Sequence, residues 1–364
     1  MRGVSLISAC LLLAACGGGG GASEASNEVQ TFYVNPTGND HNSGLSPERP
    51  FRTIGRAVDG LEPGDVVYVA PGAYIAPPIP ADGDRATQVV EIKGLAGTPN
   101  EPIAIIADSR GEQTLTEAGE VIIDGEDVAI GLRVSRSTSV ILDGFRIVRA
   151  RGENDAGIQV RSHSDGTIVR NCIISDSADG VRVEGSDDAL IFNNLVYGND
   201  NRGVRIGSGS QRVRLINNTI VGNGNRGVYI GGADADSIAP TDATLQNNIL
   251  QDNQSLAIAV DEGPPSALVG YSGNFNLVFA TRFADQTRAY RPSSIIGAKD
   301  VNLDAQFVDA EGGDFHLAAD SPAIDAGTDA IGDALRSALF QRSATADGRV
   351  DGHPVDIGYH YPLR

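Results

Sequence analysis

The sequence predicts an all-β fold, a right-handed parallel β-helix, and three observations support this prediction. A phrase in which glycine precedes two apolar residues separated by a variable one recurs between residues 131 and 261. A second phrase, built around two asparagines, follows in successive repeats, and neither phrase has a helical period. A repeat of this size indicates a solenoid, because one unit cannot bury its own apolar face and must stack on the next.

The repeat gives the expected course of each coil. The glycine phrase begins at Gly131, Gly157, Gly180, Gly203 and Gly227, with a weaker copy at Ala257, so the spacings are 26, 23, 23, 24 and 30 residues. The asparagine phrase occurs at Asn193-Asn194, Asn217-Asn218 and Asn247-Asn248, and imperfectly at Asn171-Cys172. We expect short strands closed by Gly and Asn corners, where the backbone becomes left-handed. The asparagines are expected to stack as a ladder. A leucine-rich repeat would need its own consensus and helical segments, which the sequence lacks.

The N-terminus is typical of a lipoprotein signal. Arg2 precedes an apolar run over residues 4–13, and Leu13-Ala14-Ala15-Cys16 resembles a bacterial lipobox. We expect residues 1–15 to be a signal peptide, Cys16 to be lipidated, and residues 16–30 to form a flexible Gly/Ser-rich tether. An ordinary secretory signal is the alternative. The expected location is the bacterial cell envelope, lipid-anchored in the outer membrane, on its periplasmic or outer face.

Composition narrows the partners. The 364 residues carry a formal charge of −19, which argues against nucleic acid, and tryptophan is absent, which weakens any model of a neutral glycan stacked on aromatic rings. Cys10 would leave with the signal and Cys16 would be acylated, so Cys172 remains and is expected to be a small buried side chain. No disulfide is then available, and we expect a monomer.

Both ends of an open β-helix need caps, because they expose apolar core and strand edges. We assign residues 31–285 to the β-helix with its N-terminal cap and residues 286–364 to an irregular C-terminal capping segment. Thr53 is a candidate helix N-cap. Ile54, Ala57, Val58 and Leu61 follow at helical spacing, and they predict an amphipathic helix that closes the N-terminal end.

Segments at both ends carry a resemblance. The sequence has Phe32–Asp40, Pro50–Ile54, Pro63–Asp65 and Pro71–Tyr74 near its start, and Asp314–Leu317, Ser321–Gly327 and Val355–Tyr361 near its end. These segments resemble secreted bacterial right-handed β-helix proteins, a group that includes polysaccharide lyases acting on pectate, alginate or glycosaminoglycans. The resemblance implies the architecture over most of the mature chain. It does not assign an activity, because one fold hosts many functions.

Arginines gather on one predicted face. In each glycine phrase the residue between the two apolar ones points outward and stacks on its counterpart in the next coil. This places on one face, or at its edge, Arg133, Arg161, Arg182, Arg202, Arg205 and Arg226. Like charges about 5 Å apart repel, so they need acidic partners. Either Glu184, Asp179 and Asp200 neutralise them, or the face is a groove that binds an acidic polysaccharide through guanidinium groups.

Cleavage of a uronate by β-elimination needs a group to neutralise the carboxylate, a base and an acid. The resembling lyases commonly use Lys or Arg as base, often with Ca²⁺. Here Lys93 and Lys299 are the only lysines, and neither lies on the central repeats. The candidates are therefore Arg182 and Arg205 for the carboxylate, and Tyr229 and His163 for proton transfer. His163 lies three coils from Tyr229, so the two cannot serve one bond, and each can equally be an ordinary surface residue.

Acidic residues offer a further alternative. Asp179, Glu184 and Asp187 lie on one coil and are candidate ligands of Ca²⁺, the cofactor that we consider, or a carboxylate pair for glycoside hydrolysis. The Gly-His-Gly motif of β-helix galacturonan hydrolases is absent, which ranks hydrolysis below elimination. The preferred function is therefore binding, with lyase cleavage as the candidate reaction, of an acidic polysaccharide. A non-catalytic surface or adhesion protein is the main alternative. The loop over residues 263–299, with Tyr271, Arg288, Tyr290 and Arg291, is a second place where a site could lie.

Overall fold

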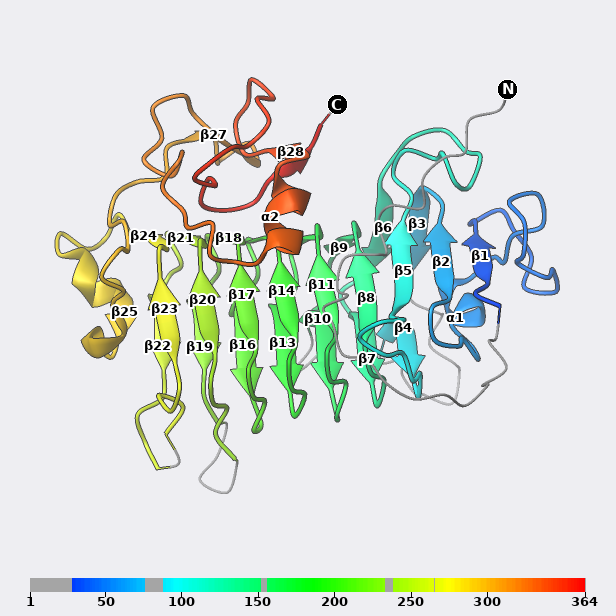
Figure 1. The fold of residues 1–364 in the computed structure, drawn as a ribbon, viewed down its shortest axis with the longest axis horizontal. Coiled ribbons are helices and arrows are strands. Elements are labelled where there is room, and N and C mark those ends of the chain that lie inside the picture. Colours follow the sequence, from blue (N-terminus) through cyan, green and yellow to red (C-terminus); the bar gives the residue numbers. More distant parts are fainter. Residues whose placement is uncertain (1–27, 76–87, 152–155, 233–237, 265, 364) are drawn as a thin grey trace, which may run out of the picture.

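The computed structural model describes residues 28–75, 88–151, 156–232, 238–264 and 266–363. They form a solenoid in which three long parallel sheets run side by side along one axis (Figure 1). The predicted all-β right-handed parallel β-helix is confirmed. The signal peptide, Cys16 and most of the tether lie outside the described residues. Among the described residues, no helix has the length and apolar character that crossing a membrane requires.

Each full coil contributes one short strand to each sheet. Sheet 1 contains β1 (Thr31–Val34), β2 (Val66–Val69), β5 (Ile103–Ala107), β8 (Val140–Asp143), β11 (Ile168–Arg170), β14 (Leu190–Phe192), β17 (Arg214–Ile216), β20 (Thr244–Gln246) and β23 (Ser272–Asn274). Sheet 2 contains β4 (Gln88–Lys93), β7 (Ile130–Ser135), β10 (Ala156–Arg161), β13 (Asp179–Glu184), β16 (Val204–Gly207), β19 (Arg226–Ile230), β22 (Leu256–Val260) and β25 (Tyr290–Arg291). Sheet 3 contains β3 (Gly72–Ile75), β6 (Val121–Asp124), β9 (Arg146–Val148), β12 (Ile173–Ser175), β15 (Leu195–Tyr197), β18 (Thr219–Val221), β21 (Ile249–Gln251) and β24 (Leu277–Phe279).

The strand register in sheet 2 is the one that the glycine phrase predicts. Arg133 pairs with Gln159, Gln159 with Arg182, Arg182 with Arg205, and Arg205 with Tyr229. The apolar residues on either side of this column point inward and are fully buried. The predicted column of outward-facing residues is thus confirmed, and its members lie on successive coils.

The repeat glycines serve a purpose other than the one expected. Gly180 does not have a positive φ. A Cβ atom at this position would lie 2.3 Å from a methyl carbon of Val196 and 2.5 Å from the carbonyl oxygen of Gly203. The glycine is therefore needed for space, since the coil turns sharply inside a filled core. The left-handed corners are formed by asparagines such as Asn193 and Asn217, with φ of 53° and 52°, and by other glycines such as Gly198 and Gly222, with φ of 61° and 64°, as expected.

The predicted asparagine ladder is present, and a second ladder runs beside it. In the first, side-chain amides of Asn194, Asn218 and Asn248 each donate to the next asparagine oxygen, at 3.0, 2.9 and 2.9 Å, and the ladder ends at Asn276. The second ladder joins Asn199, Asn223 and Asn253. All of these side chains are buried, and Cys172, buried as predicted, occupies the first-ladder position one coil earlier.

Both ends of the core are closed. Thr53 caps the N-terminal helix α1 (Ile54–Ala57) through its side chain, and the predicted apolar stripe is buried, although the helix has a single turn. At the other end, the 3-10 helices η1 (Gln286–Ala289) and η2 (Ser293–Ile295) flank β25, and Ala289, Tyr290 and Ile295 join the core. The loop over residues 263–299 therefore supplies the irregular C-terminal cap.

The remaining C-terminal residues leave that end and return along the side of the solenoid (Figure 1). They contain β26 (Phe307–Asp309) and β27 (Asp314–Leu317), helix α2 (Asp333–Leu339), and β28 (Arg342–Ser343) and β29 (Tyr361–Pro362). The left-handed asparagines hold this segment, since Asn193, Asn217 and Asn247 donate to the carbonyl oxygens of His360, Asp356 and Thr328. Most of the segment that we expected to cap the end thus covers the coil corners instead.

Candidate functional site

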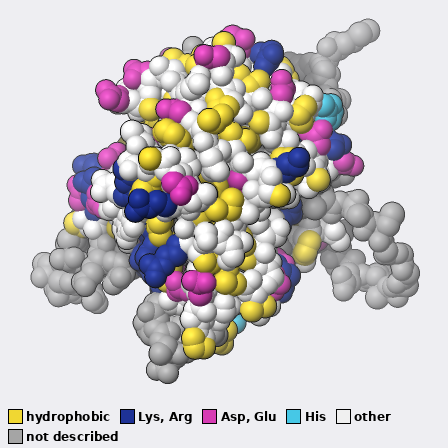
Figure 2. Space-filling view, turned by 90° about the vertical axis from the view of Figure 1, so that its left-hand side faces the viewer, with side chains coloured by type: hydrophobic (Ala, Val, Ile, Leu, Met, Phe, Trp, Pro, Cys, Tyr) yellow, Lys and Arg dark blue, Asp and Glu magenta, His cyan; other side chains and the backbone are white. Residues whose placement is uncertain are grey.

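The candidate site lies on the outer face of sheet 2. We call Arg182, Arg202, Arg205 and Arg226 the arginine cluster; they come from β13, β16, β19 and the corner before β16. Figure 2, which looks onto the C-terminal end of the solenoid, shows Lys and Arg side chains gathered with Asp and Glu side chains on one flank. The strand register confirms the predicted placement of Arg182 and Arg205 on one face, but these two side chains are largely buried.

Two members of the cluster are buried by their own neighbours. The Nη2 atom of Arg182 donates to Glu184 Oε1 across 2.8 Å, and its Nε lies 3.6 Å from Asp179 Oδ2. The Nη1 atom of Arg205, on the next coil, lies 3.4 Å from the same Glu184 oxygen. The side chains of Arg182 and Arg205 are only 7% and 11% exposed. They therefore share the Glu184 carboxylate.

The other two members hold an aromatic ring between them. The guanidinium carbon of Arg226 lies 4.6 Å from the centre of the Tyr229 ring, and that of Arg202 lies 5.1 Å from it. Such contacts are favourable because the ring face is electron-rich. Arg202 also lies 3.6 Å from Asp179 Oδ2 and is more exposed than Arg182 and Arg205. These two arginines form the accessible part of the cluster.

The hydroxyl end of Tyr229 is fixed by the next coil. It donates to Asp261 Oδ2 across 2.5 Å. A Cβ atom at Gly231 would lie 2.1 Å from that Asp261 oxygen and 2.7 Å from the Tyr229 hydroxyl, so only glycine fits there. The sequence analysis assigned no role to Asp261. The sequence signal for this pair is that Gly231 and Asp261 occupy equivalent outward positions on successive coils, one without a side chain and the next with a carboxylate.

The local charge balance differs from that of the whole chain. Among the described residues, four guanidinium groups face three carboxylates, those of Asp179, Glu184 and Asp261, in a protein of net charge −19. The buried Nε atoms of Arg202, Arg205 and Arg226 find no hydrogen-bond acceptor among the described residues. Burial, and then the charge of Arg182, lowers the pKa of Arg205, while burial raises the pKa of Asp179 in spite of Arg202 beside it. The cluster is therefore short of negative charge.

The other predicted residues lie outside the cluster. Arg133 donates to the side-chain oxygens of Gln159 and Gln88, and its register partner on β4 is Glu91. Arg161 is exposed and close to Ser162. His163 is exposed at the corner after β10, three coils from Tyr229, as expected. Asp200, considered as a neutralising acid, pairs with Arg151 instead.

The structure does not bring together the three acids considered for Ca²⁺. Arg182 lies between Asp179 and Glu184, contacting both, while Asp187 forms its ion pair with Arg212 at a different corner. Arginines occupy the place that a cation would need. Among the described residues, the group with metal-ligand geometry is a different one, Asp351, Asp356 and His360.

The loop over residues 263–299 offers no competing site through its tyrosines. The Tyr271 side chain points into the core region, with its hydroxyl buried, and Tyr290 is buried and donates to Asp300 Oδ2 across 3.0 Å. Burial raises the pKa of both hydroxyls. These groups stabilise the cap, and the arginine cluster remains the candidate site.

Comparisons with known proteins agree with the fold. Residues 126–274 match the family model described as a right handed beta helix region. A rhamnogalacturonan lyase structure is 16% identical, with 79% of this chain and 93% of that chain covered and a TM-score of 0.50. A pectate lyase structure is also 16% identical, with 82% and 92% covered and a TM-score of 0.48. No curated protein sequence is significantly similar. The chain is therefore a right-handed parallel β-helix protein whose fold resembles that of polysaccharide lyases.

Proposed function

We propose that this protein binds an acidic, uronate-containing polysaccharide through the arginine cluster. The observation that carries the proposal is the excess of guanidinium over carboxylate groups on sheet 2, in a chain that is otherwise strongly acidic. An anionic chain would supply the missing negative charge. The name of the structural neighbour with a TM-score of 0.50, a rhamnogalacturonan lyase, supports a polysaccharide as the ligand class.

The members of the arginine cluster have different roles in the proposed binding. Arg202 and Arg226 offer accessible guanidinium groups, which match carboxylates in a forked geometry. Arg182 and Arg205 are positioning residues, because they hold Glu184 and keep the local field positive. Arg161, exposed on an earlier coil, lengthens the surface along the stack. Successive sugar units would then follow the direction in which the coils stack.

Binding without cleavage is the form that the geometry favours. Burial, together with the hydrogen bond to Asp261, raises the pKa of Tyr229, so its hydroxyl stays protonated at neutral pH and can act as an acid but not readily as a base. Arginine is a poor base because it stays charged. Neither the protonated Tyr229 hydroxyl nor a charged arginine is a good base, and this favours the adhesion function over β-elimination. The glycan assay described below distinguishes the two.

We also propose that the chain acts in the bacterial envelope, anchored in the outer membrane through acylated Cys16. The sequence around Leu13-Ala14-Ala15-Cys16 supports this, and the tether over residues 16–30 would set the distance of the solenoid from the membrane. Mass spectrometry of the purified chain tests it. The N-terminal residue should be Cys16 carrying acyl groups.

The binding experiment uses affinity gels and ultraviolet absorbance with pectate, alginate, chondroitin sulfate and a heparin-like chain. We expect retardation by at least one acidic glycan, none by a neutral glycan, and loss of retardation as salt rises. The double variant Arg202→Gln, Arg226→Gln should lose binding, while Arg336→Gln on α2, outside the cluster, should keep it. A rise in absorbance from unsaturated uronate ends would add lyase activity. No retardation by any acidic glycan would sink the proposal.

A further inference from the structure

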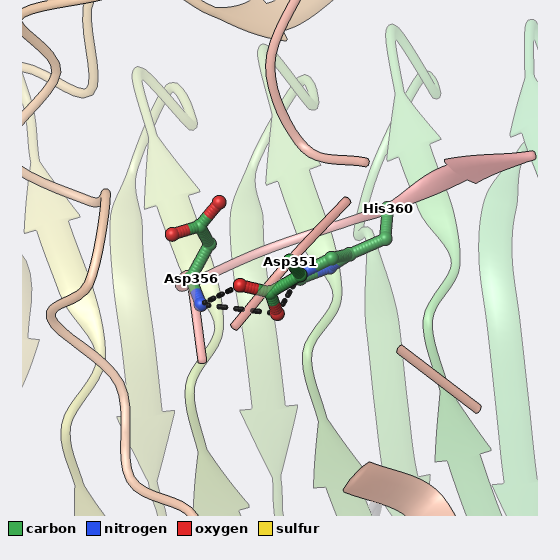
Figure 3. Close-up of side chains that lie close together, drawn as sticks. All are labelled: Asp351, Asp356 and His360. Carbon is green, nitrogen blue, oxygen red and sulfur yellow. Dashed lines mark hydrogen bonds and ion pairs between the residues drawn. The ribbon is translucent and has the colours of Figure 1, made fainter. Parts of the chain in front are cut away.

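The C-terminal segment contains a second group of functional side chains, unrelated to the arginine cluster. Asp351, Asp356 and His360 each offer one ligand atom, and these atoms all lie within 4.8 Å of one another. Figure 3 shows His360 and Asp351 pointing toward each other, with Asp356 beside them. All three residues are buried; His360 has no exposed surface and Asp356 is 3% exposed. The sequence analysis included Asp356 and His360 only as members of the segment Val355–Tyr361, one of those that resemble other β-helix proteins.

Hydrogen bonds fix the orientation of the imidazole. The Nδ1 atom of His360 lies 2.9 Å from the carbonyl oxygen of Gly358. A carbonyl accepts only, so Nδ1 carries the hydrogen, and Nε2 faces the Asp351 carboxylate at 2.8 Å. A histidine that donates one nitrogen to a backbone carbonyl and turns the other toward carboxylates has the orientation of a metal ligand. Without a metal, a proton must sit between Nε2 and Asp351.

The group is short of positive charge. Asp351 forms its ion pair with His360, and among the described residues no ion pair reaches Asp356. The Asp356 carboxylate accepts from the backbone N–H of Asp325, whose own carboxylate adds to the negative field. A buried pair of carboxylates needs a cation or a proton to compensate it.

We propose that Asp351, Asp356 and His360 bind a divalent transition-metal ion of the zinc class. One imidazole nitrogen with two carboxylate oxygens is a ligand set that suits zinc and its neighbours, whereas Ca²⁺ prefers six to eight oxygens. Ligand atoms of one zinc ion lie roughly 3–4 Å apart, so small side-chain movements would complete the set. The ion would take the place of the proton between His360 and Asp351.

The position of the group indicates what the ion would do. The backbone of His360 exchanges hydrogen bonds with the Asn193 side chain, at 2.7 and 3.0 Å, and the Asp356 carbonyl accepts from Asn217 at 2.9 Å. The ion would thus join Asp351, Asp356 and His360 of the returning segment. Two of these residues, Asp356 and His360, are already hydrogen-bonded to asparagines at the coil corners. We assign it a structural role, that of fastening this segment to the solenoid. The inference does not depend on glycan binding.

The test uses the full chain in detergent, freed of metal with a chelator and titrated with zinc by calorimetry and elemental analysis. We expect one tightly bound zinc ion and a higher midpoint of thermal unfolding when zinc is present. The isosteric variant Asp356→Asn should weaken zinc binding by about 100-fold or more and abolish the thermal shift. His353→Gln, an exposed histidine that pairs with Asp329, is the matched control and should keep both.

A second measurement keeps the inference testable if Asp356→Asn or His360→Gln fails to fold. The X-ray absorption spectrum of zinc bound to the unaltered chain should show one nitrogen donor of imidazole type and oxygen donors. The inference is overturned by the absence of stoichiometric zinc, by zinc binding that survives in folded Asp356→Asn, by a sulfur or multi-histidine ligand set, or by preferential binding of Ca²⁺.

Discussion

The hydroxyl of Tyr229 donates a hydrogen bond to the Asp261 carboxylate of the next coil across 2.5 Å. The pair joins two coils, since Tyr229 and Ala259 are partners in the register and Asp261 follows two residues later. With Arg202 and Arg226 against its ring, the tyrosine is fixed at both its aromatic and its polar end. Tyr229 is thus an organising side chain of the arginine cluster.

The first prediction separates the ring of Tyr229 from its hydroxyl. Tyr229→Phe keeps the contacts with Arg202 and Arg226, so acidic-glycan binding should change by less than about threefold. Tyr229→Ala removes the ring against which the two guanidinium groups are held, so the arginines are no longer preorganised and binding should weaken about tenfold. Affinity electrophoresis of the three proteins measures both effects. Equal loss in the two variants would instead assign the hydroxyl a direct role with the ligand.

A second prediction concerns the first asparagine ladder. The Asn218 amide donates to Ile191 O and to Asn248 Oδ1, and its oxygen accepts from Asn194. Asn218→Ala takes this donor from the Ile191 carbonyl and removes the acceptor of the buried Asn194 backbone N–H, so the free energy of unfolding should fall by about 3 kcal/mol. Urea denaturation measures the change.

Asn225→Ala provides the matched control for the ladder. Asn225 is partly buried and its side chain donates to Asn201 across 3.1 Å, so this change should cost about 1 kcal/mol. A loss at Asn218 no larger than the loss at Asn225 would contradict the view that the ladder stabilises the stack through fully satisfied hydrogen bonds.

The periodic part of the fold could be predicted because each coil repeats the same strands and corners. The glycine phrase fixes the register, so Arg182 above Gln159 and below Arg205 follows from spacing alone. The second ladder was missed because Asn199 and Asn223 lie outside the quoted phrases, although they recur with the same period. The returning C-terminal segment has no period, and its contact between His360 and Asn193 joins residues far apart in the sequence.

The sequence predicted on which face the cluster arginines lie, but not how much of each side chain is exposed to solvent. Spacing places arginines on one face, yet it does not say that Arg182 and Arg205 share Glu184 and become buried in doing so. Burial depends on the rotamers of long side chains, which the period leaves open. The same reasoning explains why Asp179 and Glu184 seemed free to hold Ca²⁺, since sequence spacing cannot show that the Arg182 guanidinium lies between them.

A third prediction concerns Cys172. The side chain has no exposed surface, and burial raises its pKa to about 12. Because the thiolate is the nucleophile, Cys172 should resist alkylation in the folded protein and react only as the chain unfolds. Alkylation measured along a urea gradient should follow the unfolding curve, with Cys172→Ala to subtract any reaction of Cys16 or Cys10. Rapid alkylation in native buffer would show that the core around Asn194 opens locally.

The last prediction uses the raised pKa of Asp179. Burial outweighs Arg202 and Arg182, so the folded protein holds the Asp179 proton more tightly than the unfolded chain, whose ordinary pKa is 3.8. Between 3.8 and the raised value the unfolded state is ionised while the native state keeps its proton. The free energy of unfolding contributed by this group must therefore fall as pH rises through that interval, and then stay constant.

Asp179→Asn removes this titration, so the stability of the unaltered protein relative to the variant should decrease as pH rises above 3.8. Asp188→Asn is the opposite case. The hydrogen bond from Arg212 lowers the pKa of Asp188, so its contribution is present above the ordinary pKa and lost as pH falls through the lowered one. Urea unfolding of the three proteins, measured from below pH 3.8 up to neutral pH, should give difference curves of opposite slope, that of Asp179 falling above pH 3.8 and that of Asp188 rising below it. Slopes of the same sign would mean that Arg202 and Arg182 compensate the burial of Asp179, and the arginine cluster would then have less unbalanced positive charge to offer an acidic glycan.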